Sequence, residues 1–156
     1  MSTPHPTATL HDQPIPLRVK LAAAWTSFMF LYAYVDILNF FTPGVVDDIL
    51  DGRVFEFDVS QTFSATALTL MAVPILMIVL SVTLPAPASR ITNLIVALLY
   101  VPVTAFNALG ESWLLFYGLG IVLELMLLGL IVRYAWAWPR AASSATAAPV
   151  GTSRTV

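Results

Sequence analysis

Residues Trp113–Trp138, WLLFYGLGIVLELMLLGLIVRYAWAW, form an almost unbroken apolar run with one carboxyl group, Glu124, near its middle. A helix needs about 20 mainly apolar residues, each rising about 1.5 Å, to cross the hydrocarbon core of a bilayer. The run is long enough for such a crossing and therefore predicts a transmembrane helix. An acid at that depth costs about 2.5 to 3.5 kcal/mol on insertion scales, so Glu124 is a candidate for a special role.

Three further apolar runs, residues 17–42, 62–84 and 91–109, are also long enough to cross a bilayer. Hydrophobic residues make up 58% of the 156-residue chain and charged residues 10%, whereas soluble domains carry about 25% charged residues. Two of the three connections are only a few residues long, so neighbouring helices must be antiparallel. We predict an all-α fold, with four transmembrane helices (about 17–42, 62–84, 91–109 and 113–138) bundled in one domain over residues 17–139.

The first run also has a competing interpretation as a signal peptide. Arg18 and Lys20 could form the basic region that precedes such a segment. However, the apolar stretch that follows is longer than the usual length of about 7 to 15 residues, and no small-x-small cleavage site lies before the acidic loop. We therefore expect the first helix to be retained.

Proline, glycine and hydroxyl residues mark the predicted helix ends. Proline and glycine interrupt helices, and a serine or threonine side chain can cap the first turn. On this basis the first helix is predicted to end at Thr42-Pro43-Gly44. The second helix is capped by Ser60 or Thr62 and ended by Pro85 and Pro87. The third helix is capped by Ser89, and Gly110 marks its end.

The distribution of charge predicts how the bundle lies in the membrane. Six of the seven cations flank the same ends of the helices: Arg18, Lys20, Arg90, Arg133, Arg140 and Arg154. The predicted outer loop, residues 43–61, holds five acids and only Arg53. The positive-inside rule therefore predicts a multi-pass protein of the plasma membrane with both termini in the cytoplasm. Residues 1–16 and 140–156, which lack apolar content, are predicted to be disordered cytoplasmic tails.

Two local patterns add detail to this topology. In the acidic loop, Val45–Leu50 predicts a short helix on the membrane surface, and alternation over residues 55–59 predicts an extended return. Trp136 and Trp138 at the inner end of the last run are typical of the aromatic belt at a membrane interface. We interpret them as anchors and not as binding residues.

Helical spacing places the intramembrane acids on polar faces. On the first helix Asp36 shares a face with Tyr32 and Asn39, and on the fourth Glu124 shares a face with Tyr117. Both faces are expected to point into the bundle, where Asn107 of the third helix lies at a similar depth. The candidate site is therefore the cluster Tyr32, Asp36, Asn39, Asn107, Tyr117 and Glu124.

The predicted cluster contains acids but no cation. Arg133 is nine residues from Glu124, or about 13 Å along a helix axis. Without a basic partner, one or both acids are expected to be protonated at neutral pH. Such an acid could simply hydrogen-bond to a neighbouring helix and hold the bundle together, or it could serve as a proton relay or a cation site.

Prolines interrupt two of the predicted helices. Pro74 and Pro102 each remove a backbone hydrogen bond and are predicted to kink the second and third helices. The carbonyl groups released in this way could bind a ligand or water, or the prolines could only shape the packing.

Several classes of function are disfavoured by composition. The chain has no cysteine, which excludes disulfides, thiol redox chemistry and thiolate metal sites. Neither histidine lies in an apolar run, and neither a GxSxG nor an HExxH motif is present. The loop only partly matches a calcium-binding spacing, since Ile49 occupies a ligand position. We expect no catalytic residue, no cofactor and no metal, and the net charge of −2 gives no reason to expect nucleic acid.

Several stretches together form a recognisable pattern. They are Lys20-Leu21 through Trp25, Asp36-Ile37-Leu38, Val73-Pro74-Ile75 through Leu80-Ser81 to Leu84-Pro85, Arg90 with Asn93, Glu124, and Trp136-Ala137-Trp138. This pattern resembles an uncharacterised family, a domain of unknown function, of small bacterial four-helix integral membrane proteins, over roughly residues 18–139. The family pattern favours a basic residue where this chain has Val82, which argues against a phosphate or anionic-lipid role for the inner loop. The resemblance implies the four-helix architecture and names no substrate.

Two functional hypotheses follow. The first is a small transporter or channel-like protein for a proton or small solute, with Glu124 as the titrating group. Small multidrug exporters with four helices are similar only in size and in having an essential acid. The alternative is a structural or regulatory membrane subunit that docks a partner through its polar helix face. Expected partners are the lipid bilayer and either a second copy of the chain or another membrane protein.

Overall fold

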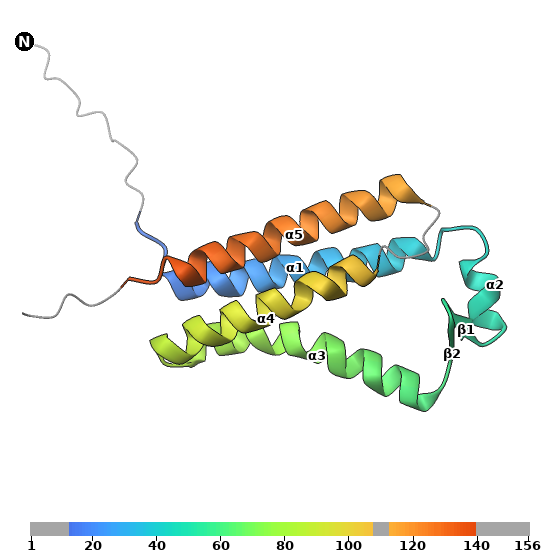
Figure 1. The fold of residues 1–156 in the computed structure, drawn as a ribbon, viewed down its shortest axis with the longest axis horizontal. Coiled ribbons are helices and arrows are strands. Elements are labelled where there is room, and N and C mark those ends of the chain that lie inside the picture. The colour runs from blue at the N-terminus through green and yellow to red at the C-terminus, as the bar shows by residue number, and fades with distance from the viewer. Residues whose placement is uncertain (1–12, 108–112, 140–156) are drawn as a thin grey trace, which may run out of the picture.

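The computed structural model describes residues 13–107 and 113–139, and four long helices dominate them (Figure 1). These are α1 (Leu17–Asn39), α3 (Gln61–Thr83), α4 (Ala86–Phe106) and α5 (Leu114–Trp136). Each is long and apolar enough to cross a membrane. The predicted all-α fold with four membrane-spanning helices is confirmed.

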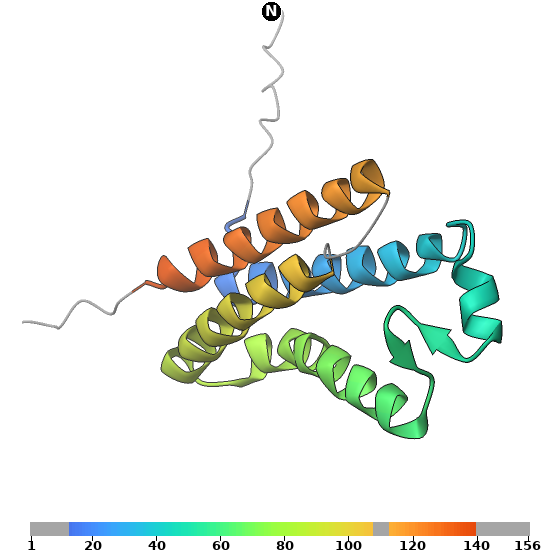
Figure 2. The same cartoon turned by 45° about the vertical axis from the view of Figure 1, so that its right-hand side comes forward.

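The helices form an up-and-down bundle in which sequence neighbours are antiparallel (Figure 1). Helix α1 packs against α3 and α5, and α4 packs against α5 and less extensively against α3. One end of the bundle carries the α1–α3 connection, and we call it the hairpin end. The other end, where α1 begins and α5 ends, is the termini end. Helix α3 leans away from the other three toward the hairpin end (Figure 2).

The connection at the hairpin end is folded. It contains the short helix α2 (Val45–Leu50) and a two-stranded antiparallel hairpin of β1 (Arg53–Val54) and β2 (Phe57–Asp58). Arg53 pairs with Asp58 and Val54 pairs with Phe57, so Phe55 and Glu56 form the tip of the hairpin. The predicted short helix over residues 45–50 is present. Of the extended return predicted over residues 55–59, only Phe57–Asp58 form a strand, because Phe55 and Glu56 make the turn.

Several helix ends differ from the predicted positions. Helix α1 ends at Asn39 instead of residue 42, and α4 begins at Ala86 instead of residue 91. Pro87 does not end α3 but lies in the first turn of α4, where a missing backbone N–H costs nothing because that group has no partner within the helix. Ser89 is consequently not a cap: it lies inside α4 and is buried. Helix α4 ends at Phe106 and not at residue 109, and the predicted marker Gly110 lies outside the described residues.

The cap predicted for the second long helix has formed. The Ser60 hydroxyl accepts a hydrogen bond from the Phe63 backbone N–H at 3.1 Å. This satisfies one of the N–H groups that the first turn of α3 leaves unpaired. Ser60 therefore sets where α3 starts after the hairpin.

A buried polar network joins three helices in the half of the bundle nearest the termini. Asn93 Oδ1 accepts hydrogen bonds from Trp25 Nε1 at 2.7 Å and from the Ser81 hydroxyl at 3.1 Å. Asn93 Nδ2 donates to the Ser89 carbonyl at 2.7 Å, and the Ser89 hydroxyl donates to the Ser81 carbonyl at 3.2 Å. All four residues are fully buried. Since each polar group is satisfied by another, the network fixes how α1, α3 and α4 meet.

Aromatic rings pack directly beside this network. The Trp25 ring meets those of Phe28 and Tyr100 edge to face, with ring centroids 5.8 and 6.5 Å apart. Leu21, Leu128 and Ile131 complete a core with 0–1% exposure. This half of the bundle is tightly closed.

Pro74 lies inside α3 and changes the hydrogen bonding of that helix. Proline has no N–H, so the carbonyl of Leu70, four residues earlier, loses its helical partner. The Tyr100 hydroxyl of α4 donates to this Leu70 carbonyl. The released carbonyl group therefore binds a neighbouring helix rather than a ligand.

We predict that Asn93→Ala lowers the free energy of unfolding by about 1–3 kcal/mol, because Trp25 Nε1 loses its acceptor at a buried position. Thermal or denaturant unfolding in detergent measures the change. Thr69→Ala is the matched control, since Thr69 is exposed and its hydroxyl bonds only to Ala65 of the same helix, at 2.8 Å. Equal losses in the two variants would contradict the role given to the network.

Candidate functional site

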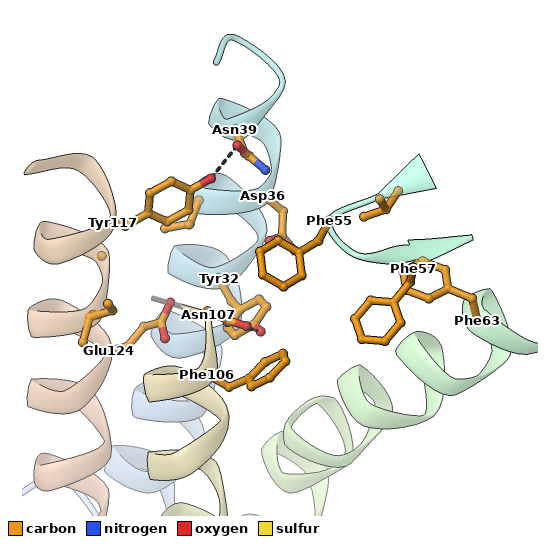
Figure 3. Close-up of a pocket in the computed structure, with 14 residues that line it drawn as sticks. Tyr32, Asp36, Asn39, Phe55, Phe57, Phe63, Phe106, Asn107, Tyr117 and Glu124 are labelled. Atoms are coloured by element: carbon orange, nitrogen blue, oxygen red, sulfur yellow. Dashed lines mark hydrogen bonds between the residues drawn. The ribbon is translucent and has the colours of Figure 1, made fainter. Parts of the chain in front are cut away.

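A pocket with a volume of about 240 Å³ lies in the half of the bundle nearest the hairpin (Figure 3). Helices α1 and α5 form two of its walls, and the C-terminal end of α4, the hairpin and the start of α3 supply the rest. The pocket exists because α3 leans outward at this end and the hairpin covers part of the gap. Its lining residues are Tyr32, Val35, Asp36, Asn39, Val54, Phe55, Phe57, Phe63, Phe106, Asn107, Tyr117, Gly120, Ile121 and Glu124.

The six residues of the predicted polar cluster all line this pocket. Tyr32, Asp36 and Asn39 project from α1 at steps of four and three residues, which keeps them on one face of the helix. Tyr117 and Glu124 project from α5. Asn107 was predicted to lie within the third helix, but it directly follows α4 as its C-terminal cap. The fold therefore brings the six predicted residues together around one pocket.

Two hydrogen bonds link the walls of the pocket. Asn107 Nδ2 donates to the Tyr32 hydroxyl oxygen at 2.5 Å, which joins the end of α4 to α1. The Tyr117 hydroxyl donates to Asn39 Oδ1 at 2.6 Å, which joins α5 to α1 near the hairpin end. These pairs orient four of the six side chains (Figure 3 shows the second pair).

Glu124 lies at the deep side of the pocket. Its exposed fraction is only 3%, and its carboxyl group points from α5 toward Tyr32 and Asn107 (Figure 3). Its Oε2 atom is buried and has no hydrogen-bond partner. The nearby Thr104 hydroxyl of α4 faces this carboxyl group but is itself outside hydrogen-bonding geometry. A buried oxygen without a partner is unusual in a folded protein and marks a place where a proton could bind.

Asp36 occupies a different environment from Glu124. It is exposed and lies nearer the hairpin, where it lines both the pocket and an adjoining hollow of about 580 Å³. The hollow also contacts α2 and the hairpin, and it shares Asn39, Phe55 and Tyr117 with the pocket. The two cavities therefore adjoin one another beside Asp36, and Glu124 lines only the deeper one.

Sequence analysis did not identify the aromatic part of the pocket. Phe55 and Phe57 come from the hairpin, Phe63 from α3 and Phe106 from the last turn of α4. The rings of Phe57 and Phe63 stack with centroids 5.9 Å apart. The alternation of apolar residues over 55–59 was the available signal, but it did not show which way the hairpin folds.

Phe55 has an unusual backbone conformation at the tip of the hairpin. Its φ angle is +57°, in the left-handed region that costs residues other than glycine about 1–2 kcal/mol. Such conformations persist where the surrounding structure requires them and are frequent at functional sites. Here the conformation holds the ring over the pocket near Asp36 (Figure 3).

A bundle of four membrane-spanning helices with a polar pocket open at one end defines a multi-pass membrane protein with a candidate ligand site. Residues 16–145 match a protein family described as a family of unknown function, DUF6326. The chain belongs to this family, which confirms the resemblance to an uncharacterised family. No curated protein and no solved structure matches the chain.

We predict that Gly120→Leu destabilises the protein by about 1–3 kcal/mol through overpacking. A Cβ atom at Gly120 would lie 3.2 Å from Val35 Cγ2, because α1 and α5 approach closely beside the pocket. The matched control is Gly129→Leu on the same helix, where a Cβ atom would meet nothing within 4 Å. The melting temperature in detergent should fall only for the first variant. A fall of similar size for both variants would contradict the explanation that the close approach of α1 and α5 excludes a larger side chain at position 120.

Proposed function

We propose that the protein is a small transporter for a solute, with Glu124 as the residue that binds alternately a proton and the solute. The observation that carries the proposal is the Glu124 carboxyl group, which is only 3% exposed and lines a pocket without a lysine or arginine among the described residues. We propose this binding role rather than catalysis.

The proton and the solute would compete for Glu124 because the pocket can balance only one positive charge at this carboxylate. No lysine or arginine lines the pocket among the described residues. A carboxylate far from water is stabilised only by a proton or by a nearby cation. Binding of a positively charged group would therefore release the Glu124 proton, and return of the proton would release the solute.

The shape of the described bundle supports transport from one side at a time. The pocket and the adjoining hollow beside Asp36 both lie at the hairpin end. On the termini side of Glu124, Phe28, Trp25 and Leu128 close the core with 0–1% exposure. A pocket that is open at one end of the bundle and closed at the other supports the proposal, because alternating access requires such an arrangement of a transporter.

We propose that the hairpin end faces outward from a bacterial plasma membrane and that both termini are cytoplasmic. At the termini end three cations lie over aromatic rings, each with 5.9 Å to the ring centroid: Arg18 over Trp138, Lys20 over Tyr134 and Arg90 over Trp136. The hairpin end carries the acidic residues of α2 and the hairpin, with Arg53 as their cation. The positive-inside rule supports this orientation.

Replacing Glu124 with glutamine tests the transport proposal. Glu124→Gln keeps the size of the side chain but cannot release a proton, so proton-coupled flux into reconstituted vesicles should fall to the background level. The flux is measured with a pH-sensitive dye inside the vesicles. Glu56→Gln is the matched control, because Glu56 is an exposed acid of the hairpin tip that does not line the pocket. Undiminished flux in the Glu124 variant would exclude transport through this residue.

Cysteine labelling tests the orientation, and the absence of native cysteines makes the background clean. Single cysteines at Asp48, in α2, and at Ser153, in the C-terminal segment, are treated with a membrane-impermeant maleimide on intact cells. We expect labelling at position 48 and labelling at position 153 only after the membrane is opened. Labelling of position 153 on intact cells would reverse the proposed orientation.

A second candidate function, docking of a partner helix, is favoured by the uncovered half of α3. Between Gln61 and Leu70 every residue except Phe63 is exposed. Several are hydroxyl residues, which can hydrogen-bond across helices in a membrane. Crosslinking through a cysteine at Thr66 would detect a neighbouring chain there. A Thr66 crosslink together with unchanged flux in Glu124→Gln would favour the subunit function over transport.

A further inference from the structure

We infer that the pocket binds a small organic cation, such as a protonated or quaternary amine with apolar substituents. The inference rests on the proposed site and adds the chemical class of its ligand. It combines three features of the pocket: the sign of its charge, its aromatic walls and its size.

Among the described residues, the pocket is lined by two acidic side chains and by no basic one. Glu124 lies at the deep side and Asp36 at the entrance, on facing helices. The nearest described cation, Arg53, lines the adjoining hollow and is paired with Asp48 at 3.7 Å. An anion entering the pocket would meet two acids and no unpaired cation among the described lining residues, so the site selects against negative ligands.

Aromatic rings surround the acids. Six of the fourteen lining residues are aromatic: Tyr32, Phe55, Phe57, Phe63, Phe106 and Tyr117. The face of an aromatic ring attracts a cation through its quadrupole, and a desolvated site strengthens this attraction. Several rings around carboxyl groups are the combination that recognises alkylammonium groups, which are positively charged and weakly hydrated.

The same geometry disfavours a metal ion as the ligand. A hard cation needs about six or more oxygen ligands, yet the Tyr32 hydroxyl already accepts from Asn107 and Asn39 Oδ1 accepts from Tyr117. Within residues 13–107 and 113–139, no group of three or more His, Cys, Asp or Glu residues could hold a metal ion. Apolar rings also cannot replace the water that a metal ion would lose on entering.

The size of the pocket limits the ligand. Its volume of about 240 Å³ lies below the roughly 300–1,000 Å³ typical of pockets for drug-sized molecules. A trimethylammonium group with a short substituent fits this space. The ring of Phe55, held at the hairpin tip with a positive φ angle, lies where it would cover such a group.

Three probes of nearly equal shape test the class of ligand by calorimetry on the full chain in a maltoside detergent, which has no ammonium group. They are choline, its neutral carbon isostere 3,3-dimethyl-1-butanol, and the anion 3,3-dimethylbutanoate. We expect choline to bind at least about tenfold more tightly than the neutral isostere, and we expect no binding of the anion. Equal or tighter binding of either control would overturn the inference without requiring any variant.

Variants then assign the binding to this pocket. Glu124→Gln should weaken choline binding at least about tenfold, since the cation loses its buried counter-charge, and Glu56→Gln should not change it. Phe57→Leu should weaken binding roughly two- to fivefold through loss of a cation–π contact. Its control is Phe41→Leu, a ring that is 75% exposed and does not line the pocket. Unchanged affinity in both Glu124→Gln and Phe57→Leu would place the cation elsewhere and contradict the inference.

Binding and flux separate this inference from the proposed function. If Glu124→Gln abolishes flux but choline binds no more tightly than its neutral isostere or the anion, the inferred class of ligand is wrong and the transport proposal stands. If choline binds with the expected selectivity but is not carried across vesicle membranes, the inference on the ligand stands and transport is contradicted.

Discussion

The hydrogen bonds of Asn93 are the interaction on which the rest of the structure depends. One side-chain amide receives Trp25 from α1 and Ser81 from α3, while its own nitrogen bonds back to α4. In an apolar surrounding these groups have no alternative partner in water, so their satisfaction defines one arrangement of three helices. These three helices are held together in the half of the bundle nearest the termini, whereas α3 leans away from the other helices at the hairpin end (Figure 2).

That asymmetry explains why a pocket forms at the hairpin end. On the termini side of Glu124 the aromatic and aliphatic core is closed. On its hairpin side, α3 leans outward and the hairpin returns the chain across the opening. Polar side chains that would be costly in lipid therefore gather in a protected space. The two acids are held at different depths, with one at the entrance and one at the deep side, so a ligand would meet them in succession.

Much of the fold was predictable because its signals are local. Apolar length fixed the four spanning helices, and steps of three and four residues placed Tyr32, Asp36 and Asn39 on one face. Other features depend on partners far away in the sequence. Ser89 was predicted to be a helix cap because its neighbours suggest an N-terminus, but it is buried by α3, and Phe55 and Phe57 reach the pocket only because the hairpin folds over it. The pattern that resembles the family included Trp25, Ser81 and Asn93, yet spacing alone did not show that they bond to one another.

The pairing of Pro74 with Tyr100 has a consequence for how this chain can change in evolution. Proline leaves the Leu70 carbonyl without a helical donor, and the phenol of α4 supplies one. If Tyr100 alone became phenylalanine, the carbonyl would be left unpaired in the bundle. If Pro74 alone became alanine, the carbonyl would regain its helical bond and could still accept from the phenol, because a carbonyl oxygen has two lone pairs. Loss of the phenol therefore costs least after the proline has been replaced, so the order of the two replacements matters in the evolution of this chain.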